Sequence, residues 1–388
     1  MTPKERLLAA LQHREPDRVP FDLGSTGVTG VHRIAYRNLL AHLGMETDGV
    51  RICDPIQQLA EVDEEVLRRF GVDTRGVRPR PSSSWSLKIE TEKGGKYTHF
   101  TDEFGIRWSM PRQGGLYYDM TSHPLEGATT EEEIESHPFP DPQDPARVAG
   151  LREEAERLAD EGWAVVLNGP GEGPFERALW LRGFERFFID LIRSPALALA
   201  LLDRLVDFRI KFWELLLREV GDLAQVVIEG DDLATQRGLM ISPEMYRKYL
   251  KPRHKRVFSF IKERAPHVKI FFHSCGAVYE LIPDLIEVGV DILNPVQLSA
   301  AGMDPRKLKR EFGAALTFWG GGVDTQRVLP RGTPEEVKTE VKRRIEELAP
   351  GGGFVFATVH NIQADVPPEN ILAMWEALQE YGVYSSPT

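Results

Sequence analysis

A histidine and a cysteine separated by one residue stand at the end of an apolar run, and this spacing suits a metal ion. The segment Val268–Pro295 reads VKIFFHSCGAVYELIPDLIEVGVDILNP, with His273 and Cys275 directly after the run. The chain has 388 residues and only two cysteines, Cys53 and Cys275. Imidazole and thiolate on one short turn favour zinc. From the spacing alone, a buried cysteine packed behind a backbone-bonded histidine is an equally good interpretation.

A third possible metal ligand follows a later apolar run. His360 comes shortly after Phe354–Thr358. Three protein ligands and one open position form the usual catalytic zinc site. Such a zinc ion would bind a thiol, lower the pKa of that thiol and present it as a thiolate nucleophile. The sequence therefore predicts a metal site made of His273, Cys275 and His360.

Polar residues follow almost every apolar run, which indicates one functional face. We expect catalytic roles for Glu229, Asp231, Asn294 and Gln297, and binding of substrate or cofactor by Asn168, Gln236 and Asp324. Because the carboxyl ends of barrel strands share one rim, Glu229, Asp231 and Gln236 should face the same cleft as His273. Capping of the following helix would explain Asp324 and Asp232, but it explains only one residue in each loop.

Eight short apolar runs, separated by helical patterns, would position these residues. They are Arg18–Gly24, Thr74–Pro79, Ala164–Pro170, Gln225–Gly230, Lys269–Ser274, Val290–Pro295, Ala315–Gly321 and Phe354–Thr358. Most are continuous rather than alternating, as is typical of parallel strands buried on both faces. Eight strand–helix units predict an α/β fold of the (β/α)8 TIM-barrel type, with the active site at the carboxyl ends of the strands.

One region, residues 80–142, interrupts this repeat. Its alternating pattern and the Gly94-Gly95 turn predict an antiparallel β-hairpin inserted between the second and third strands. We expect the insertion to belong to a single barrel domain that spans residues 1–388. Its aromatic residues could line a ligand cleft, although a small hydrophobic core of the hairpin explains most of them better: Trp85, Tyr97, Trp108, Tyr117 and Tyr118.

Composition excludes several classes of protein. The net charge is −11, which argues against nucleic acid as the main partner. No apolar run reaches the roughly 20 residues of a membrane span. Two distant cysteines argue against a disulfide framework and favour a reducing, cytoplasmic location. We expect Cys53 to be structural or to border the cleft. Four histidines in charged helical patterns are expected at the surface: His13, His42, His254 and His267.

Six segments spread along the chain carry a family resemblance. They read TPKERLLAALQHREPDRVPFD, GPGEGPFERALWLRGFERFFIDL, EGDDLATQRGLMISPEMYRKYLKP, FFHSCG, WGGGVDTQRVLPRGTPEEV and GGGFVFATVHNIQADVPPENI. Over essentially its whole length the chain resembles the uroporphyrinogen decarboxylase superfamily. It is most similar to the branch of methylcobalamin:coenzyme M methyltransferases and related corrinoid-dependent methyltransferases. The resemblance implies a (β/α)8 barrel, in agreement with the strand count.

Two departures from the family pattern bear on the reaction. Uroporphyrinogen decarboxylases carry an Arg-Gln-Ala-Gly-Arg segment whose arginines bind the carboxylates of the substrate. Here the corresponding segment reads PFDLGSTGVTGVHRIAYRNLL and lacks it. The methyltransferase branch binds zinc through His-x-Cys and a second, late cysteine. His273 and Cys275 match this motif, but the late segment reads TVHNIQADVPP, where His360 is the only soft ligand.

The resemblance implies a zinc-dependent methyltransferase. It would move a methyl group, in either direction, between methylcobalamin on a separate corrinoid protein and a thiol or other small molecule. His360 or an acid such as Glu229 would complete the zinc shell. The alternative is a metal-free carboxy-lyase that acts on a tetrapyrrole or another acid. A non-catalytic binding barrel is a third hypothesis, which the many ionisable groups at one face disfavour.

Overall fold

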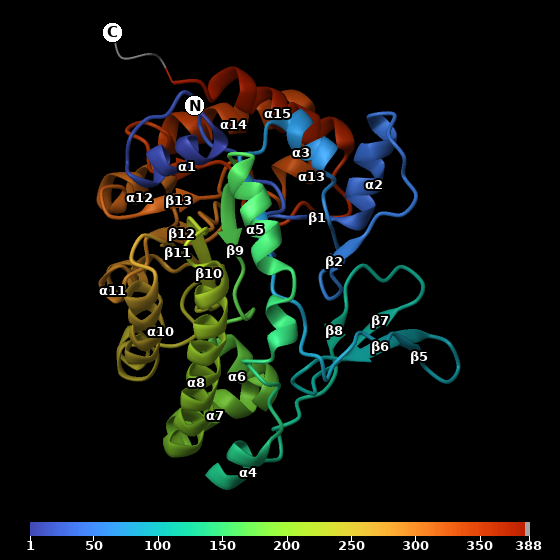
Figure 1. Ribbon diagram of the computed structural model, residues 1–388, viewed down its shortest axis with the longest axis vertical. Coiled ribbons are helices and arrows are strands. Elements are labelled where there is room, and N and C mark those ends of the chain that lie inside the picture. The colour runs from blue at the N-terminus through green and yellow to red at the C-terminus, as the bar shows by residue number, and fades with distance from the viewer. Residues whose placement is uncertain (385–388) are drawn as a thin grey trace.

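Seven parallel strands form a curled sheet at the centre of the computed structural model, which describes residues 1–384 (Figure 1). In sheet order they are β14 (Phe354–Val355), β13 (Thr317–Trp319), β12 (Ile292–Asn294), β11 (Lys269–His273), β10 (Val226–Gly230), β9 (Ala164–Leu167) and β4 (Thr74–Val77). Strands that are consecutive in the barrel are neighbours in the sheet, and every neighbouring pair is parallel. The predicted α/β, TIM-barrel-like fold is confirmed.

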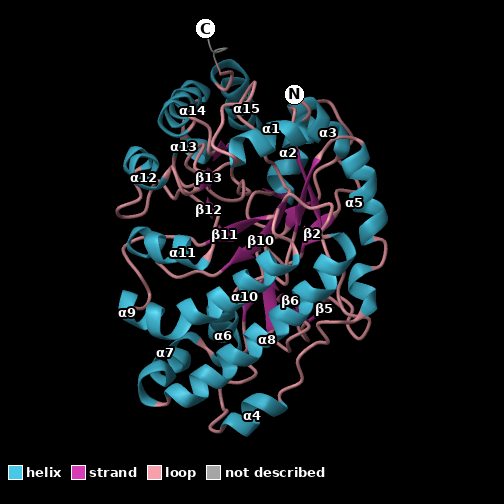
Figure 2. Ribbon diagram, turned by 60° about the vertical axis from the view of Figure 1, so that its left-hand side comes forward, coloured by secondary structure: helices cyan, strands magenta, loops and turns pink. Residues whose placement is uncertain are grey.

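Helices surround this sheet (Figure 2). They are α1 (Pro3–Leu11), α2 (Arg33–His42), α3 (Glu64–Phe70), α4 (Glu131–Ser136), α5 (Leu151–Asp160), α6 (Pro174–Arg182), α7 (Phe184–Arg193), α8 (Pro195–Val220), α9 (Pro243–Met245), α10 (Lys251–Arg264), α11 (Ile282–Val288), α12 (Pro305–Phe312), α13 (Val328–Arg331), α14 (Pro334–Leu348) and α15 (Pro368–Tyr381). Among the described residues, none of the helices combines the length and apolar composition that a membrane span requires.

The expected first strand, Arg18–Gly24, forms isolated bridges instead of a full ladder. Phe21 pairs in parallel with Phe356, just after β14, and its carbonyl accepts a hydrogen bond of 2.8 Å from the backbone N–H of Asp73, just before β4. Pro20 has no N–H to donate, which limits pairing on this segment. The segment nevertheless lies between the two edge strands and closes the barrel.

The barrel interior is filled by alternate residues of the strands and by one helix. Val226, Phe271 and Ile292 belong to a small interior cluster that includes Leu7 and Leu11 of α1. The next residue along each of these strands belongs instead to the large core between strands and helices. Side chains of a strand alternate between its two faces, so this pattern separates residues that point into the barrel from those that point at the helices.

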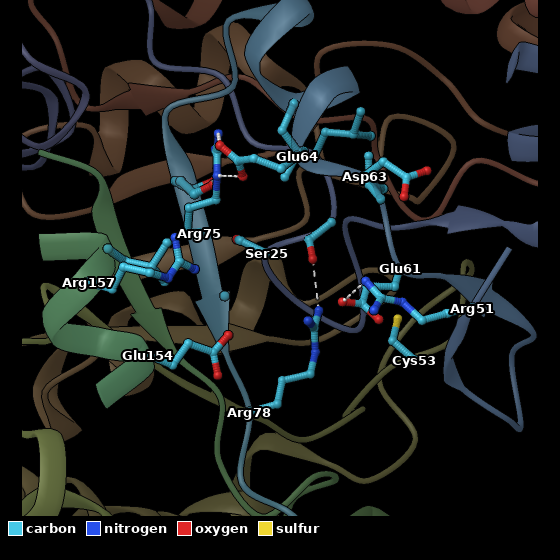
Figure 3. Close-up of a pocket in the computed structure, with 17 residues that line it drawn as sticks. Ser25, Arg51, Cys53, Glu61, Asp63, Glu64, Arg75, Arg78, Glu154 and Arg157 are labelled. Atoms are coloured by element: carbon cyan, nitrogen blue, oxygen red, sulfur yellow. Dashed lines mark hydrogen bonds and ion pairs between the residues drawn. The ribbon is translucent and has the colours of Figure 1, made fainter. Parts of the chain in front are cut away.

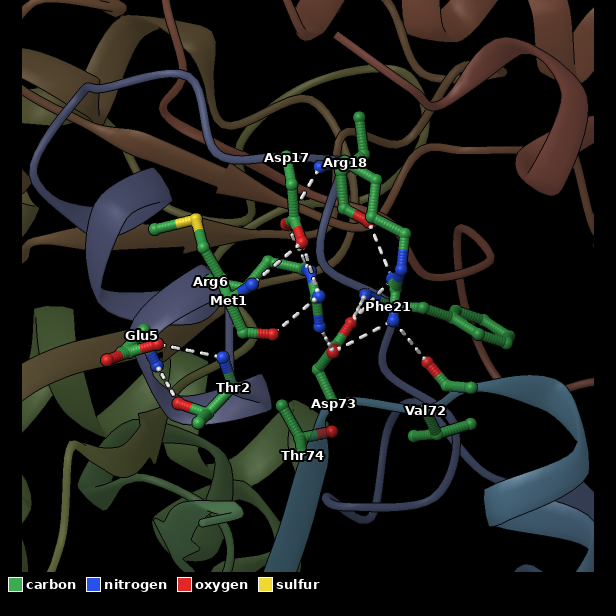
Figure 4. A network of polar contacts seen from close by, with 12 residues as sticks. Met1, Thr2, Glu5, Arg6, Asp17, Arg18, Phe21, Val72, Asp73 and Thr74 are labelled. Atoms are coloured by element: carbon green, nitrogen blue, oxygen red, sulfur yellow. Dashed lines mark hydrogen bonds and ion pairs between the residues drawn. The ribbon is translucent and has the colours of Figure 1, made fainter.

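Asp73 joins the closing segment to β4 at the amino end of the barrel (Figure 4). Its carboxylate accepts hydrogen bonds from Arg6 at 2.6 Å, from Arg18 at 2.8 Å and from the backbone N–H of Phe21 at 2.8 Å. Only 1% of the Asp73 side chain is exposed. Two guanidinium groups and a backbone donor therefore compensate one buried carboxylate, and they fix α1 and the closing segment to the sheet.

A second, antiparallel sheet interrupts the chain between β4 and β9. It consists of β5 (Glu90–Thr91), β6 (Tyr97–Thr101), β7 (Arg107–Pro111) and β8 (Asp119–Met120), paired in that order, with Gly94 and Gly95 in the first turn. In Figure 1 it extends to one side of the barrel. The predicted inserted hairpin is confirmed and has two further strands. A small third sheet pairs β1 (Val31–His32), β3 (Leu59–Ala60) and β2 (Ile52–Asp54).

Candidate functional site

Three soft donor atoms meet at the carboxyl end of the barrel. His273 Nε2 and Cys275 Sγ are 3.5 Å apart, and one ligand atom each of His273, Cys275 and His360 all lie within 4.8 Å of one another. A tetrahedral zinc ion with ligand bonds of about 2.0–2.3 Å separates its ligand atoms by about 3.3–3.8 Å. The spacing of His273 and Cys275 fits that value, and small side-chain rotations would bring His360 to it.

Asn294 orients the imidazole of His273. The two residues are register partners on β11 and β12, and His273 Nδ1 lies 2.6 Å from Asn294 Oδ1. Asn294 is fully buried, and its amide nitrogen donates to the carbonyl of Trp319 at 2.8 Å. This second bond fixes the amide with its oxygen toward His273, so Nδ1 carries the proton and the Nε2 lone pair faces Cys275. Outer-shell partners of this kind orient metal ligands in zinc proteins.

Replacing Asn294 with alanine is expected to weaken zinc binding by about 10–100-fold, because the imidazole of His273 loses its orienting acceptor. Competition with a chromogenic chelator measures the change. Asn370→Ala is the matched control, because Asn370 is also buried and donates to two backbone carbonyls, of Leu329 and Gly332, at 2.8 Å. Equal zinc affinities of the two variants would contradict the role of Asn294.

The turn that carries Cys275 is held by two side chains. Asp232 Oδ1 accepts from the backbone N–H of Cys275 at 2.8 Å, and Gln297 Oε1 accepts from that of Gly276 at 2.5 Å. Gly276 has a φ of 93°, and a Cβ there would lie 2.6 Å from the carbonyl of Thr235, so only glycine fits. Asp232 Oδ1 also lies 3.8 Å from His273 Nε2, which makes it the carboxylate nearest to the imidazole that the structure records.

The protonation of the donors reflects their burial. Burial, and then the neighbouring His273, lower the pKa of His360 to about 3, so its imidazole is neutral and has a free lone pair. Burial, and then the negative charges of Asp232 and Glu176, raise the pKa of the Cys275 thiol. A cation between these groups would reverse the second effect, because thiolates are the form that binds metal.

A cavity of about 430 Å³ opens beside the donors. His273 and His360 line it, together with Trp108 of the inserted sheet and Trp180 of α6, whose rings meet edge to face at 5.1 Å. The remaining lining residues are Gly27, Val28, Asp54, Ile56, Gln57, Asn168, Gly169, Gly171, Glu172, Glu176, Ile228, Glu229, Gly230 and Asp232. An aromatic residue of the insertion, Trp108, therefore lines this cavity, as the sequence suggested for some of them.

Glu176 is an acid of the cavity lining that the sequence analysis did not single out. It lies in the first turn of α6, and its carboxyl has no hydrogen-bond or ion-pair partner among the described residues. Burial, followed by the charges of Asp232 and Glu172, raises its pKa well above the usual range. The signal that could have revealed it is an acid in the first helical turn after the glycine-rich segment that follows a strand end.

Glu229 borders the cavity, but its carboxylate is engaged elsewhere. One oxygen accepts from Arg209 at 2.7 Å and the other from the indole N–H of Trp213, both on α8. The register pairs Glu229 with Phe272 and Gly230 with His273, so Glu229 points at the helices while His273 points into the barrel. Our expectation that Glu229 could complete the zinc shell is not supported, and Asp232 is the nearer acid.

Asp231 does not face the cleft, contrary to the sequence-based expectation. Its side chain is fully buried, accepts from the backbone N–H groups of Phe175 and Glu176 at 3.0 and 2.7 Å, and lies 3.0 Å from His254 Nε2. It therefore holds the amino end of α6. His254, expected at the surface, is 1% exposed and also contacts the Tyr246 hydroxyl at 3.2 Å.

The three residues expected to bind substrate or cofactor have different positions. Asn168 lines the cavity, with its amide nitrogen donating to the carbonyls of Ser25 and Val77. Gln236 is exposed at the rim and bonds to Gln326 at 3.2 Å. Asp324 accepts from the backbone N–H groups of Gln326 and Arg327, so it holds the turn before α13. The alternative interpretation as a helix cap does not hold for Asp324, because the N-cap of α13 is Arg327.

Two further cavities lie near the barrel rim. One, of about 440 Å³, contains Cys53 and four arginines (Figure 3). Three of these are paired, Arg75 with Glu64, Arg51 with Glu61 and Arg157 with Glu161, each at 2.9 Å. Cys53 thus lines a different cavity from His273. The other, of about 540 Å³, is bordered by Tyr117, Gln326, Gln363 and, again, His360, so His360 lies between the two hollows.

Comparison with known proteins assigns this barrel to one family with two kinds of member. The sequence profile of the uroporphyrinogen decarboxylase (URO-D) family matches residues 104–381. A uroporphyrinogen decarboxylase from Alkalilimnicola ehrlichii is 25% identical over 97% of this chain and 93% of its own length. A methylcobamide:CoM methyltransferase, MtbA, from Methanosarcina acetivorans is 26% identical over 60% of this chain and 64% of its own length.

The fold comparison gives the same architecture. A methyltransferase from Methanosarcina mazei superposes with a TM-score of 0.62 over 98% of this chain and 99% of that one, at 21% sequence identity. This likeness establishes the shared fold. The family resemblance inferred from the six sequence segments is confirmed, and relatives of both kinds, decarboxylase and methyltransferase, are present.

Proposed function

Because the chain belongs to the uroporphyrinogen decarboxylase family, we propose that it is a zinc-dependent methyltransferase, which moves a methyl group between a corrinoid on a partner protein and a small thiol or similar acceptor. The observation that carries this proposal is the spacing of His273 Nε2 and Cys275 Sγ, 3.5 Å, with His360 in the same group of donors. The direction of transfer could be either, since the same groups serve both.

The residues of the chain would divide the work among them. His273, Cys275 and His360 would hold the zinc ion, Asn294 would orient His273, and Asp232 and Gln297 would keep the Cys275 turn in place. When bound, zinc would lower the pKa of an acceptor thiol and hold it as a thiolate. In the direction of thiol methylation, the thiol would release its proton and form a bond to the methyl group, and the corrinoid would keep the electron pair of the carbon–cobalt bond that breaks.

The two hollows beside His360 support a transfer between two molecules. The cavity with Trp108 and Trp180 is the size of a small-molecule site. The hollow bordered by Tyr117, Gln326 and Gln363 would face the corrinoid of the partner protein. The exposed Gln236 beside Gln326 would then contribute to the corrinoid side, and Asn168 to the small-molecule side.

The decarboxylase alternative fits the cavity less well. A tetrapyrrole with several carboxylates needs cationic side chains around it, because buried unpaired carboxylates are costly. Among the residues that line the 430 Å³ cavity there is no lysine or arginine, whereas five are acidic.

Two measurements on the purified protein test the proposal. Elemental analysis should find about one zinc per chain, the single site that the three donors form. With zinc bound, the protein should convert methylcobalamin and a thiol such as 2-mercaptoethanol to the methyl thioether. The change in the absorbance of the corrinoid measures this reaction. Decarboxylation of uroporphyrinogen by zinc-free protein, without methyl transfer by the zinc form, would favour the alternative.

A further inference from the structure

The charge of the small-molecule cavity is the feature that the proposed function leaves unexplained. The three acids Asp54, Glu176 and Asp232 line it without a cationic partner from lysine or arginine in the described structure. Asp54 accepts only from backbone N–H groups and from the amide of Gln57, and Asp232 accepts from the backbone N–H of Cys275. The carboxyl of Glu176 has no hydrogen-bond or ion-pair partner among residues 1–384.

The other two acids of the lining form ion pairs with arginines that do not line the cavity. Glu229 is paired with Arg209 at 2.7 Å, and Glu172 with Arg177. The guanidinium of Arg177 also lies 5.0 Å from the ring of Trp180, and its charge partly offsets the rise in the pKa of Glu176 that burial and the neighbouring acids cause. The acids that lack a lysine or arginine ion-pair partner are therefore Asp54, Glu176 and Asp232, and all three line the cavity.

A zinc ion would not cancel this excess. Zinc bound by one thiolate and two neutral imidazoles carries a net charge of about +1, because Cys275 is the only anionic donor of the three. Asp54, Glu176 and Asp232 would still have no lysine or arginine partner. A cation beside Glu176 would favour the ionised form of its carboxyl, whose pKa burial and the neighbouring acids raise.

We propose that the small molecule admitted to this cavity is cationic: a thiol that bears an ammonium group, rather than one that bears a sulfonate or carboxylate. The inference rests on the proposed function for the thiol, which the zinc would hold. The ammonium end would lie against Glu176 and Asp232 and would provide the ion-pair partner that the carboxyl of Glu176 lacks. The chain would thereby differ from a methyltransferase whose acceptor is an anionic thiol.

Three thiols that share the ethanethiol skeleton and differ in the charge of their second group test the effect of substrate charge. Isothermal titration of the zinc-loaded full chain with 2-aminoethanethiol, 2-mercaptoethanol and 2-mercaptoethanesulfonate compares a cation, a neutral molecule and an anion. We expect the aminothiol to bind at least about tenfold more tightly than the alcohol, about 1.4 kcal/mol, and the sulfonate at least about tenfold more weakly. Equal affinities, or a preference for the sulfonate, would overturn the inference and leave zinc-dependent methyl transfer intact.

A variant and its control locate the selectivity. Glu176→Gln should lower the ratio of aminothiol to alcohol affinity by at least about threefold without changing the zinc content, because Glu176 supports no other described residue through its carboxyl. Glu154→Gln is the matched control, since burial also raises the pKa of Glu154 but it lines the cavity of Figure 3. An unchanged ratio in Glu176→Gln would show that this acid does not select the charge.

An experiment on the zinc-free protein separates the cationic specificity from the proposed methyl transfer. With zinc removed by a chelator, propylammonium should still raise the melting temperature of the full chain, and 1-propanesulfonate should not. If propylammonium binds but no thiol is methylated under any condition, the proposed function is wrong while the cationic specificity stands. If neither compound binds and the thiols are methylated regardless of charge, the cationic specificity is wrong.

Discussion

Replacing Cys275 with alanine is expected to reduce bound zinc from about one ion per chain to less than about 0.1, and to reduce methyl transfer at least about 100-fold. The reason is that Cys275 supplies the only thiolate of the three donors. Without it, two imidazoles remain, which is fewer than the three protein ligands of catalytic zinc sites. Elemental analysis after gel filtration in zinc-free buffer measures the first effect.

The second cysteine of the chain is the control. Cys53 lies in the other cavity (Figure 3). Its thiol contacts the carbonyl of Ala60 at 3.5 Å. Cys53→Ala should therefore keep its zinc and its activity. Zinc retained at full stoichiometry by Cys275→Ala would place the metal elsewhere, and zinc lost from Cys53→Ala alone would do the same.

Replacing Asp73 with alanine is expected to destabilise the barrel by about 3–5 kcal/mol, the range found when one partner of a buried ion pair is removed. The guanidinium of Arg6, whose side chain is 9% exposed, would lose its buried partner, and the closing segment would lose its attachment to β4 (Figure 4). Urea unfolding followed by circular dichroism measures the change in the unfolding midpoint.

Asp17 provides a matched comparison on the same arginine. It binds Arg6 at 2.6 Å, but 43% of its side chain is exposed. Asp17→Ala should cost only about 0.2–1 kcal/mol, as for exposed ion pairs. Similar losses in the two variants would contradict the view that burial of Asp73, rather than the number of its ionic contacts, sets its contribution to stability.

The sequence alone was sufficient to predict the architecture. Continuous apolar runs are the pattern of parallel strands buried on both faces, and seven of the eight runs contain barrel strands. The remaining run, Arg18–Gly24, which comes first along the chain, forms only bridges. Pro20 lacks a backbone donor, and Phe21 pairs with one residue on each side, Phe356 and Asp73. The inserted sheet was equally readable from its alternation and its Gly94-Gly95 turn.

The sequence also indicated the donors, since few soft ligands follow strand ends in this chain. His273 and Cys275 share one turn, so their proximity follows from local geometry. That His360 joins them depends on closure of the barrel, which the family resemblance implied and the structure shows. Whether these three residues bind zinc remains a prediction for the experiments above.

Only the tertiary structure decided which acids face the cavity. Glu229 and Asp231 were both expected there, but the first binds Arg209 on the helical side and the second holds α6 with His254. Strands that are apolar on both faces give no polar contrast that reveals the inward face, so a residue at a strand end can point either way until the register with the neighbouring strand is known. Glu176 reaches the cavity from a helix, and that approach depends on how α6 packs over the barrel end.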